Sequence, residues 1–169
     1  MKKLVSLDID GVLNNYPKIF VKYANFVLRK KYKNIFDLKK SLNRLTYRAI
    51  KNHYRHSLYK YNYKIHSSIL NLINFLTKLD IDIVFLTKRN LNNQFILNNT
   101  KKWLRAHNIK FKGIYQKSKK NFLRFKPILH IDDEHKKKQN LNNVSTRFII
   151  CKKNKIEKIS IIKKFLARN

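Results

Sequence analysis

The sequence contains very few of the residues that build loops, cross-links or zinc-binding fingers. Its 169 residues include two Gly, two Pro and one Cys. So little Gly and Pro excludes collagen-like, linker-like and loop-dominated architectures. A single Cys excludes a disulfide framework and a cysteine-based zinc site, and it favours a reducing setting inside the cell. We therefore expect a cytoplasmic protein.

Long apolar runs are missing as well. A membrane-spanning helix needs about 18 or more consecutive apolar residues, and the chain has no such run. The chain also reaches its first acidic residue, Asp8, too early for a signal peptide. We expect no membrane partner. Hydrophobic residues nevertheless make up 43% of the sequence, with 11 Phe and 9 Tyr, so residues 1–169 are expected to form one domain with its own core.

Acidic residues are scarce relative to basic ones. Nine Asp and Glu stand against 40 Lys and Arg, which gives a formal net charge of +31. AT-rich codon usage explains part of this imbalance, because Lys, Asn and Ile are abundant, but Glu also has AT-rich codons and occurs only as Glu134 and Glu157. Such a field attracts polyanions, with phosphate-bearing molecules first among them. A solvated lysine surface with no specific partner explains the composition equally well.

Five of the nine acidic residues lie in two short segments, each of which follows an apolar run. Asp8 and Asp10 follow Leu4–Leu7, and the acidic cluster 132–134 follows Ile128–Ile131. Short apolar runs bounded by polar residues are typical of buried parallel strands. The carboxyl ends of such strands meet at the edge where open α/β sheets bind ligands. We expect both acidic segments to lie at that edge.

The rest of the chain alternates between apolar runs and amphipathic segments. This alternation predicts an α/β fold with a doubly wound, Rossmann-like parallel sheet. The further predicted strands are Ile81–Thr87, Phe111–Tyr115 and Arg147–Cys151. The predicted helices are 67–79, one that runs through Trp103, a short one capped by Ser118 and closed by Pro127, and 156–166.

Residues 14–64 interrupt this alternation and are predicted to form a small helical cap insert after the first strand. They show no strand pattern, but apolar residues recur at helical spacing: Ile19, Tyr23, Phe26, Val27, Leu38, Leu42 and Leu45. The second half of the insert, from Tyr47 to Tyr63, interleaves aromatic with basic residues. Such interleaving suits a groove for nucleotides or single strands. The alternative is a helix that packs its Tyr rings on the core and leaves its Lys side chains outside.

Asp8 and Asp10 are separated by one residue at the end of a strand and are followed by Gly11, which allows a sharp turn. A calcium loop would need Gly at its sixth position and Glu at its twelfth. Counted from Asp8, Gly11 is fourth and Ile19 is twelfth, so a calcium loop is excluded. The segment Asp8–Leu13, with the sequence DIDGVL, instead resembles the first signature of the haloacid dehalogenase (HAD) superfamily of phosphotransferases.

Later segments resemble the other signatures of this superfamily, in the expected order. Thr87 ends an apolar strand, as the Ser or Thr of the second signature does, and the pair Asp132-Asp133 resembles the acidic fourth signature. A lone DxDG is unspecific, whereas three signatures in order, each after an apolar run, span residues 8–133. The third signature is a Lys upstream of the last of these strands, and the best-spaced candidates are Lys119 and Lys120, with Lys117 and Lys126 as alternatives.

The resemblance implies a Mg²⁺-dependent phosphatase that works through an aspartyl-phosphate. In this superfamily the first Asp is the nucleophile and the second is the acid and base, which implies these roles for Asp8 and Asp10. The metal would be held by Asp8, the carbonyl of Asp10 and Asp133, with Asp132 in support. The other candidates would hold the phosphoryl oxygens or other parts of the substrate: Thr87, the signature Lys, Lys88 and Arg89.

Three functions are compatible with this resemblance. DIDGVL and the helical insert are similar to the 5′(3′)-deoxyribonucleotidase-like branch, which implies a nucleoside monophosphate as substrate, although Val12 stands where Thr is commonest in the superfamily. The charge of +31 favours a phosphatase that acts on nucleic-acid ends. The third is a basic nucleic-acid-binding protein on an inactive HAD fold, and the presence of Asp8, Asp10, Thr87 and Asp133 argues against it.

Overall fold

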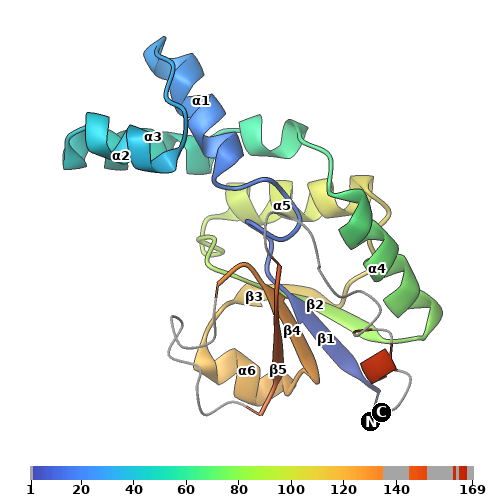
Figure 1. Ribbon diagram of the computed structural model, residues 1–169. Coiled ribbons are helices and arrows are strands. Elements are labelled where there is room, and N and C mark those ends of the chain that lie inside the picture. The colour runs from blue at the N-terminus through green and yellow to red at the C-terminus, as the bar shows by residue number, and fades with distance from the viewer. Residues whose placement is uncertain (1, 135–144, 152–161, 163, 167–169) are drawn as a thin grey trace.

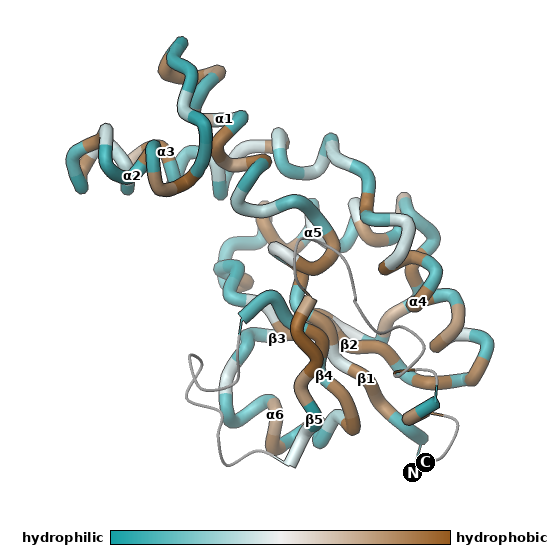
Figure 2. Tube along the Cα trace, viewed as in Figure 1, coloured by the Kyte–Doolittle hydropathy of each residue, from teal (hydrophilic) through white to brown (hydrophobic). Residues whose placement is uncertain are grey.

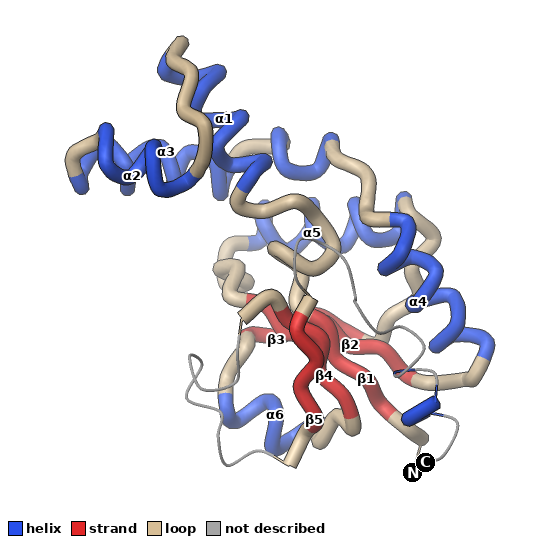
Figure 3. The backbone as a smooth tube through the Cα atoms, in the orientation of Figure 1, coloured by secondary structure: helices blue, strands red, loops and turns tan. Residues whose placement is uncertain are grey.

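The centre of the molecule is a five-stranded, all-parallel sheet (Figures 1 and 3). The structure, a computed structural model, describes residues 2–134, 145–151, 162 and 164–166. The strand order is β3-β2-β1-β4-β5, and Leu7 at the centre lies opposite Phe85 on one side and Ile131 on the other. The doubly wound, Rossmann-like α/β fold predicted from the sequence is confirmed. The strands are β1 (Leu4–Leu7), β2 (Asp82–Thr87), β3 (Gly113–Gln116), β4 (Leu129–Asp132) and β5 (Arg147–Ile150).

Helices cover both faces of this sheet. On one face α4 (Ser67–Lys78) and α5 (Gln94–Ala106) contribute Leu72 and Trp103 to the main core. On the other face Phe122 of α6 (Lys119–Phe125) packs with Leu86 and Phe148. Figure 2 shows hydrophobic residues concentrated in β1, β2 and β4, between these helices. Burial on both faces explains why the strands are continuous apolar runs rather than alternating ones.

Polar side chains set the starts of several helices. Ser118 caps α6 by accepting a hydrogen bond from the Asn121 N–H, and Asn93 caps α5 by accepting one from the Ile96 N–H. Such caps satisfy backbone donors that the first turn of a helix leaves unpaired. The helix α6 ends before Pro127, with Lys126 in the left-handed conformation. The sequence predicted both limits of α6 correctly.

Residues 14–64, which we call the helical insert, lie between β1 and α4 and extend beyond the carboxyl ends of the strands (Figure 1). They have their own core, in which Phe20 and Tyr23 of α1 contact Tyr54 of α3. The elements of the insert are α1 (Lys18–Leu28), α2 (Ile35–Ser41), α3 (Arg44–His56) and the 3₁₀ helix η1 (Tyr59–Asn62).

Three of the apolar residues that predicted helices in the insert are exposed. Phe26, Val27 and Leu45 are 76%, 41% and 78% exposed, although apolar residues at helical spacing are typical of a buried face. Periodicity identifies a face of a helix, but it does not show how far along that face another helix covers it. Of the predicted C-terminal helix, residues 156–161 and 163 lie outside the described residues, and 162 and 164–166 are helical. Within the part of the chain that the structure describes, no helix is long and apolar enough to cross a membrane.

The insert offers a matched test of its own packing. Phe20 and Phe26 both lie on α1, but Phe20 is fully buried and Phe26 is mostly exposed. We expect Phe20→Ala to lower the free energy of unfolding by about 3–5 kcal/mol, because it leaves a cavity, and Phe26→Ala to change it by less than about 0.5 kcal/mol. Urea denaturation measures both. Equal losses in the two variants would contradict the packing described for α1.

Candidate active site

The first functional residue, Asp8, sits directly at the carboxyl end of the central strand. Its backbone N–H continues the sheet by donating to the Ile131 carbonyl of β4 at 2.9 Å. The side chain is almost fully buried, and its carboxylate accepts a hydrogen bond from the Ile9 N–H. Because β1 and β4 are neighbours, Asp8 lies beside the acidic residues that end β4.

A tight loop after β1 turns Asp10 back toward the sheet. Gly11 has a φ of +91°, and a Cβ at this position would overlap the Asp133 carboxylate. Only Gly therefore fits here. The Asn14 side chain holds the loop, accepting hydrogen bonds from the Gly11 and Tyr16 N–H groups and donating to the Asp10 carboxylate at 3.0 Å. Asn14 was not among the site residues predicted from the sequence, where its only signal was an Asn three residues after a turn glycine.

Lys117 joins the carboxylates of two neighbouring strands. Its ammonium lies 2.6 Å from an oxygen of Asp8 and 2.8 Å from one of Asp132, and its side chain is only 2% exposed. Lys117 directly follows the last residue of β3. Its backbone N–H donates a hydrogen bond to the carbonyl of Thr87, the last residue of β2, and this bond fixes its position. Burial opposes the charge of Lys117, but Asp8 and Asp132 outweigh it and raise the pKa of Lys117.

Of the four lysines that the sequence offered as candidates, Lys117 is the one whose ammonium lies at the carboxylates of the site among the described residues. Lys119 and Lys120 are exposed in the first turn of α6, and Lys126 caps the other end of that helix. Among the described residues, none of these three has an ion pair with a carboxylate of the site. The usual spacing favoured Lys119 and Lys120, but β3 ends early enough to bring Lys117 to the edge of the sheet instead.

A buried histidine, His130, holds the side chain of Asp132 by a hydrogen bond. His130 Nε2 donates to an Asp132 carboxylate oxygen at 2.8 Å, and its Nδ1 lies 2.8 Å from the Ser6 hydroxyl. Burial raises the pKa of Asp132, but the hydrogen bond from His130 and the charge of Lys117 outweigh it and hold that pKa well below its usual range. Burial also lowers the pKa of His130, which keeps the ring neutral. Asp132 is therefore a fixed negative charge.

The three carboxylates of Asp8, Asp132 and Asp133 fit a metal ion. One oxygen from each lies within 4.8 Å of the others, and carboxylate oxygens are the ligands that Mg²⁺ prefers. Burial raises the pKa of Asp8 to about 7, with Lys117 opposing and Asp132 adding to the rise. Burial and the charge of Asp132 raise the pKa of Asp133 to about 7 as well. One lysine thus leaves the cluster short of positive charge, and a divalent cation would supply it.

Asp10 is held by a buried arginine on the neighbouring strand end. Arg89 donates from Nε and Nη2 to the two Asp10 oxygens at 2.8 and 2.7 Å, and its Nη1 donates to Thr100 at 2.9 Å. Burial opposes ionisation, but the Arg89 charge outweighs it and lowers the pKa of Asp10 to about 2. Arg89 was predicted from the sequence to bind substrate. In the structure it forms a bidentate ion pair with Asp10, and its guanidinium lies over the rings of Tyr61 and Trp103.

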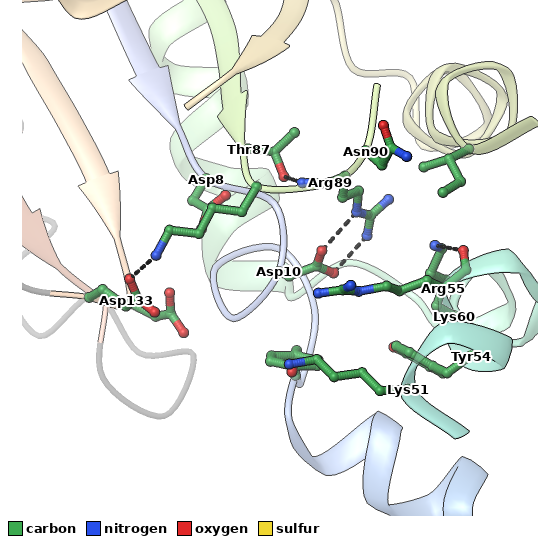
Figure 4. A pocket seen from close by; sticks show the side chains of 14 residues that line it. Asp8, Asp10, Lys51, Tyr54, Arg55, Lys60, Thr87, Arg89, Asn90 and Asp133 are labelled. Carbon is green, nitrogen blue, oxygen red and sulfur yellow. Dashed lines mark hydrogen bonds and ion pairs between the residues drawn. The ribbon is translucent and has the colours of Figure 1, made fainter. Parts of the chain in front are cut away.

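The remaining sequence candidates lie around the same cavity. Thr87 is buried at the end of β2, and its hydroxyl accepts a hydrogen bond from the Arg89 N–H at 3.2 Å. Lys88 is more exposed and forms an ion pair with Glu134 at 2.5 Å. The cavity has a volume of about 240 Å³ and is lined by sheet-edge residues on one side and by the helical insert on the other (Figure 4). Asp8, Asp10, Thr87 and Asp133 all line it.

The fold is that of the HAD-superfamily hydrolases, whereas the chain matches no protein-family model and no curated protein. A predicted phosphatase from Clostridium acetobutylicum has a TM-score of 0.58 at 14% identity, with 99% of each chain covered. A HAD-superfamily hydrolase from Ehrlichia chaffeensis has a TM-score of 0.56 at 15% identity, with 99% of this chain and 98% of that chain covered. The HAD domain of the effector protein Lem4 from Legionella pneumophila has a TM-score of 0.55 at 19% identity, with coverages of 98% and 94%.

The buried lysine can be tested by stability alone. We expect Lys117→Met to lower the free energy of unfolding by about 3–5 kcal/mol, because it leaves buried carboxylates without their cation. The loss should grow between pH 6 and pH 8, since the raised pKa values of Asp8 and Asp133 make their ionisation more costly there. Lys119→Met, two residues away on the surface, should change stability by less than about 0.5 kcal/mol. Urea titration measures both variants. Equal losses in the free energy of unfolding for Lys117→Met and Lys119→Met would contradict the role of Lys117 as the cation of the buried carboxylates.

The metal site makes a second prediction. A ligand that binds only the folded state stabilises it, so Mg²⁺ at a hundredfold excess over its Kd should raise the melting temperature by about 5–10 °C. Asp133→Ala should abolish this rise. Asp82→Asn is the matched control, because Asp82 lies at the start of β2, at the opposite edge of the sheet, and it should leave the rise intact. Calorimetry with and without Mg²⁺ measures both, and an undiminished rise in Asp133→Ala would contradict the site.

Proposed function

We propose that this protein hydrolyses phosphomonoesters with Mg²⁺, through an aspartyl-phosphate on Asp8. The observation that carries the proposal is the convergence of Asp8, Lys117, Asp132 and Asp133 at one edge of a HAD-type sheet. A phosphate ester repels an approaching carboxylate, so a site of this kind needs cations beside its nucleophile. Lys117 supplies one such charge, and the three carboxylates offer ligands for a second.

The residues of the candidate site would act in two successive steps. An oxygen of Asp8 attacks phosphorus, the bond to the leaving oxygen breaks, and Asp10 delivers a proton to that oxygen. Asp10 then takes a proton from water as the water attacks phosphorus, which frees phosphate and restores Asp8. We propose that Thr87 and Lys117 donate hydrogen bonds to the phosphoryl oxygens. Bound Mg²⁺, held by Asp8, the Asp10 carbonyl and Asp133, with Asp132 in support, would offset the negative charge of the phosphoryl group.

The ion pair between Arg89 and Asp10 gives Asp10 the form that the second step needs. With a pKa of about 2, Asp10 is a carboxylate at neutral pH and can accept a proton from water. The first step needs the protonated form. A phosphate dianion that enters the cavity raises the pKa of a neighbouring carboxylate by like-charge repulsion and competes with Asp10 for Arg89. Arg89 is therefore proposed to position Asp10 and to release it as substrate binds.

For the substrate we propose a nucleoside monophosphate. The cavity of about 240 Å³ lies against aromatic residues of the insert, among them Tyr16 and Tyr54. Its volume is below the range of about 300–1,000 Å³ that is usual for sites enclosing a whole ligand, which favours a compact phosphate ester over a long polymer. The net charge of +31 keeps phosphorylated nucleic-acid ends as the second candidate, because every oligonucleotide is attracted to such a surface.

The proposal predicts a loss of all turnover in one variant. Asp8→Asn keeps the shape of the side chain but removes the nucleophilic charge, so phosphate release should fall to the uncatalysed background. Asp37→Asn, which changes an acidic residue on α2 in the helical insert, should keep wild-type activity. The wild type should also hydrolyse nucleoside monophosphates faster than terminally phosphorylated oligonucleotides, measured at equal concentration with Mg²⁺ and about 0.15 M salt.

Each outcome of this assay has one interpretation. Mg²⁺-dependent hydrolysis by purified Asp8→Asn would contradict the aspartyl-phosphate mechanism. Faster hydrolysis of oligonucleotides would replace the nucleotidase assignment by a phosphatase of nucleic-acid ends. Oligonucleotide binding without any turnover would favour the nucleic-acid-binding alternative.

A further inference from the structure

The helical insert lines the cavity with three cations that the proposed chemistry does not use. Lys51 and Arg55 come from α3, and Lys60 comes from η1. Figure 4 shows Lys51 and Arg55 reaching from α3 toward the part of the cavity where Asp10 lies. These side chains face the sheet-edge residues across the cavity, so they would meet the part of a substrate that points away from Asp8.

No carboxylate of the described residues forms an ion pair with these three basic side chains, although the charge of Asp10 acts on Lys60. The chain has no Asp or Glu between Asp37 and Asp80, and the described residues contain no ion pair that involves Lys51, Arg55 or Lys60. Three of the four acidic residues that line the cavity already form ion pairs with other cations; Asp133, the fourth, forms none among the described residues. The three pairs are Asp8 with Lys117, Asp10 with Arg89, and Glu134 with Lys88.

Two of the insert residues that line the cavity are buried and have hydrogen-bonding groups without a partner among the described residues. Tyr54 is 4% exposed, and its hydroxyl has no hydrogen-bond partner among the described residues. Lys60 is 3% exposed and donates to the Arg55 carbonyl at 2.6 Å, which uses one of its three N–H donors. Burial, and then the charge of Arg89, lowers the pKa of Lys60 to about 7. Burying donors without acceptors is costly, and an anionic ligand would supply the missing acceptors.

The cavity has room for a second anion beside the transferred phosphoryl group. A tetrahedral phosphate occupies roughly the volume of three waters, each of about 30 Å³ in the liquid. The cavity volume is about 240 Å³, so more than half of it remains when one phosphoryl group lies at Asp8. The insert contributes Tyr16, Lys51, Tyr54, Arg55 and Lys60 to the lining of this cavity.

We propose that Lys51, Tyr54, Arg55 and Lys60 form a second anion site, which binds a phosphate group carried by the leaving group of the substrate. This inference rests on the proposed function for the site of the first phosphoryl group. It narrows the substrate class from a nucleoside monophosphate to a nucleotide with a second phosphate on its sugar. That second phosphate can be a monoester, as in a nucleoside 3′,5′-bisphosphate, or the first diester of an oligonucleotide.

Binding to a protein without turnover tests this site independently of the reaction. The experiment uses the Asp8→Asn variant with Mg²⁺ at about 0.15 M salt. Calorimetry measures its affinity for three ligands: adenosine 5′-monophosphate, adenosine 3′,5′-bisphosphate and a 5′-phosphorylated dinucleotide. We expect the bisphosphate to bind at least about tenfold more tightly than the monophosphate, because its second phosphate adds charge-assisted hydrogen bonds to the insert. Arg55→Gln and Tyr54→Phe, each added to Asp8→Asn, should reduce this ratio.

Arg44→Gln is the matched control for the loss of one positive charge. Arg44 starts the same helix, eleven residues before Arg55, which is about 16 Å along its axis, and it does not line the cavity. This variant should keep the full ratio of affinities. An equal reduction in Arg44→Gln and Arg55→Gln would show general attraction to a basic surface and would overturn the second site.

The ligands distinguish the remaining outcomes. Tight binding of the bisphosphate alone assigns the site to a free nucleotide, and equally tight binding of the dinucleotide assigns it to a strand end; both support a second anion site. Equal affinity for monophosphate and bisphosphate overturns it, even if the wild type hydrolyses monophosphates. A preference for the bisphosphate in a protein that releases no phosphate from any ligand would retain the second site and reject the proposed phosphatase.

Discussion

The ion pairs of Lys117 with Asp8 and Asp132 are the interaction on which the site depends. They join three strand ends, because Asp8 follows β1, Asp132 ends β4 and Lys117 follows β3. Buried carboxylates at this spacing repel each other, and their desolvation is costly unless a cation shares the site. Lys117 makes the arrangement stable enough to fold, yet Asp8 and Asp133 keep raised pKa values. The fold thus holds its acidic residues ready for a further cation.

The two sides of the cavity have different tasks in this account. The sheet edge carries the chemistry, with carboxylates whose ionisation is set by Lys117 and Arg89. The helical insert lines the cavity with basic and aromatic side chains, and it has its own core around Phe20 and Tyr54. Because the insert has a core of its own, we expect that its cavity-lining residues can change which leaving group is accepted without changing the reacting groups.

The sequence predicted the sheet and its acidic edge well, because both depend on local patterns. Buried parallel strands are continuous apolar runs, and carboxylates placed after two of them must meet where those strands are neighbours. The choice of Lys117 over Lys119 was not predictable in the same way, since it depends on where β3 ends to within one or two residues. The pairing of Arg89 with Asp10 and the exposure of Phe26 depend on contacts between distant segments, which no local pattern records.

The measurement that tests the central claim most directly is to locate the phosphoryl group on the protein during turnover. The wild type would be mixed with substrate and Mg²⁺, quenched in acid within milliseconds, and digested for mass spectrometry. The account predicts a phosphoryl group on the peptide that contains Asp8, labile to hydroxylamine as an acyl phosphate is, and absent from Asp8→Asn. A phosphoryl group on another residue, or steady phosphate release with none on the protein at any time, would contradict it.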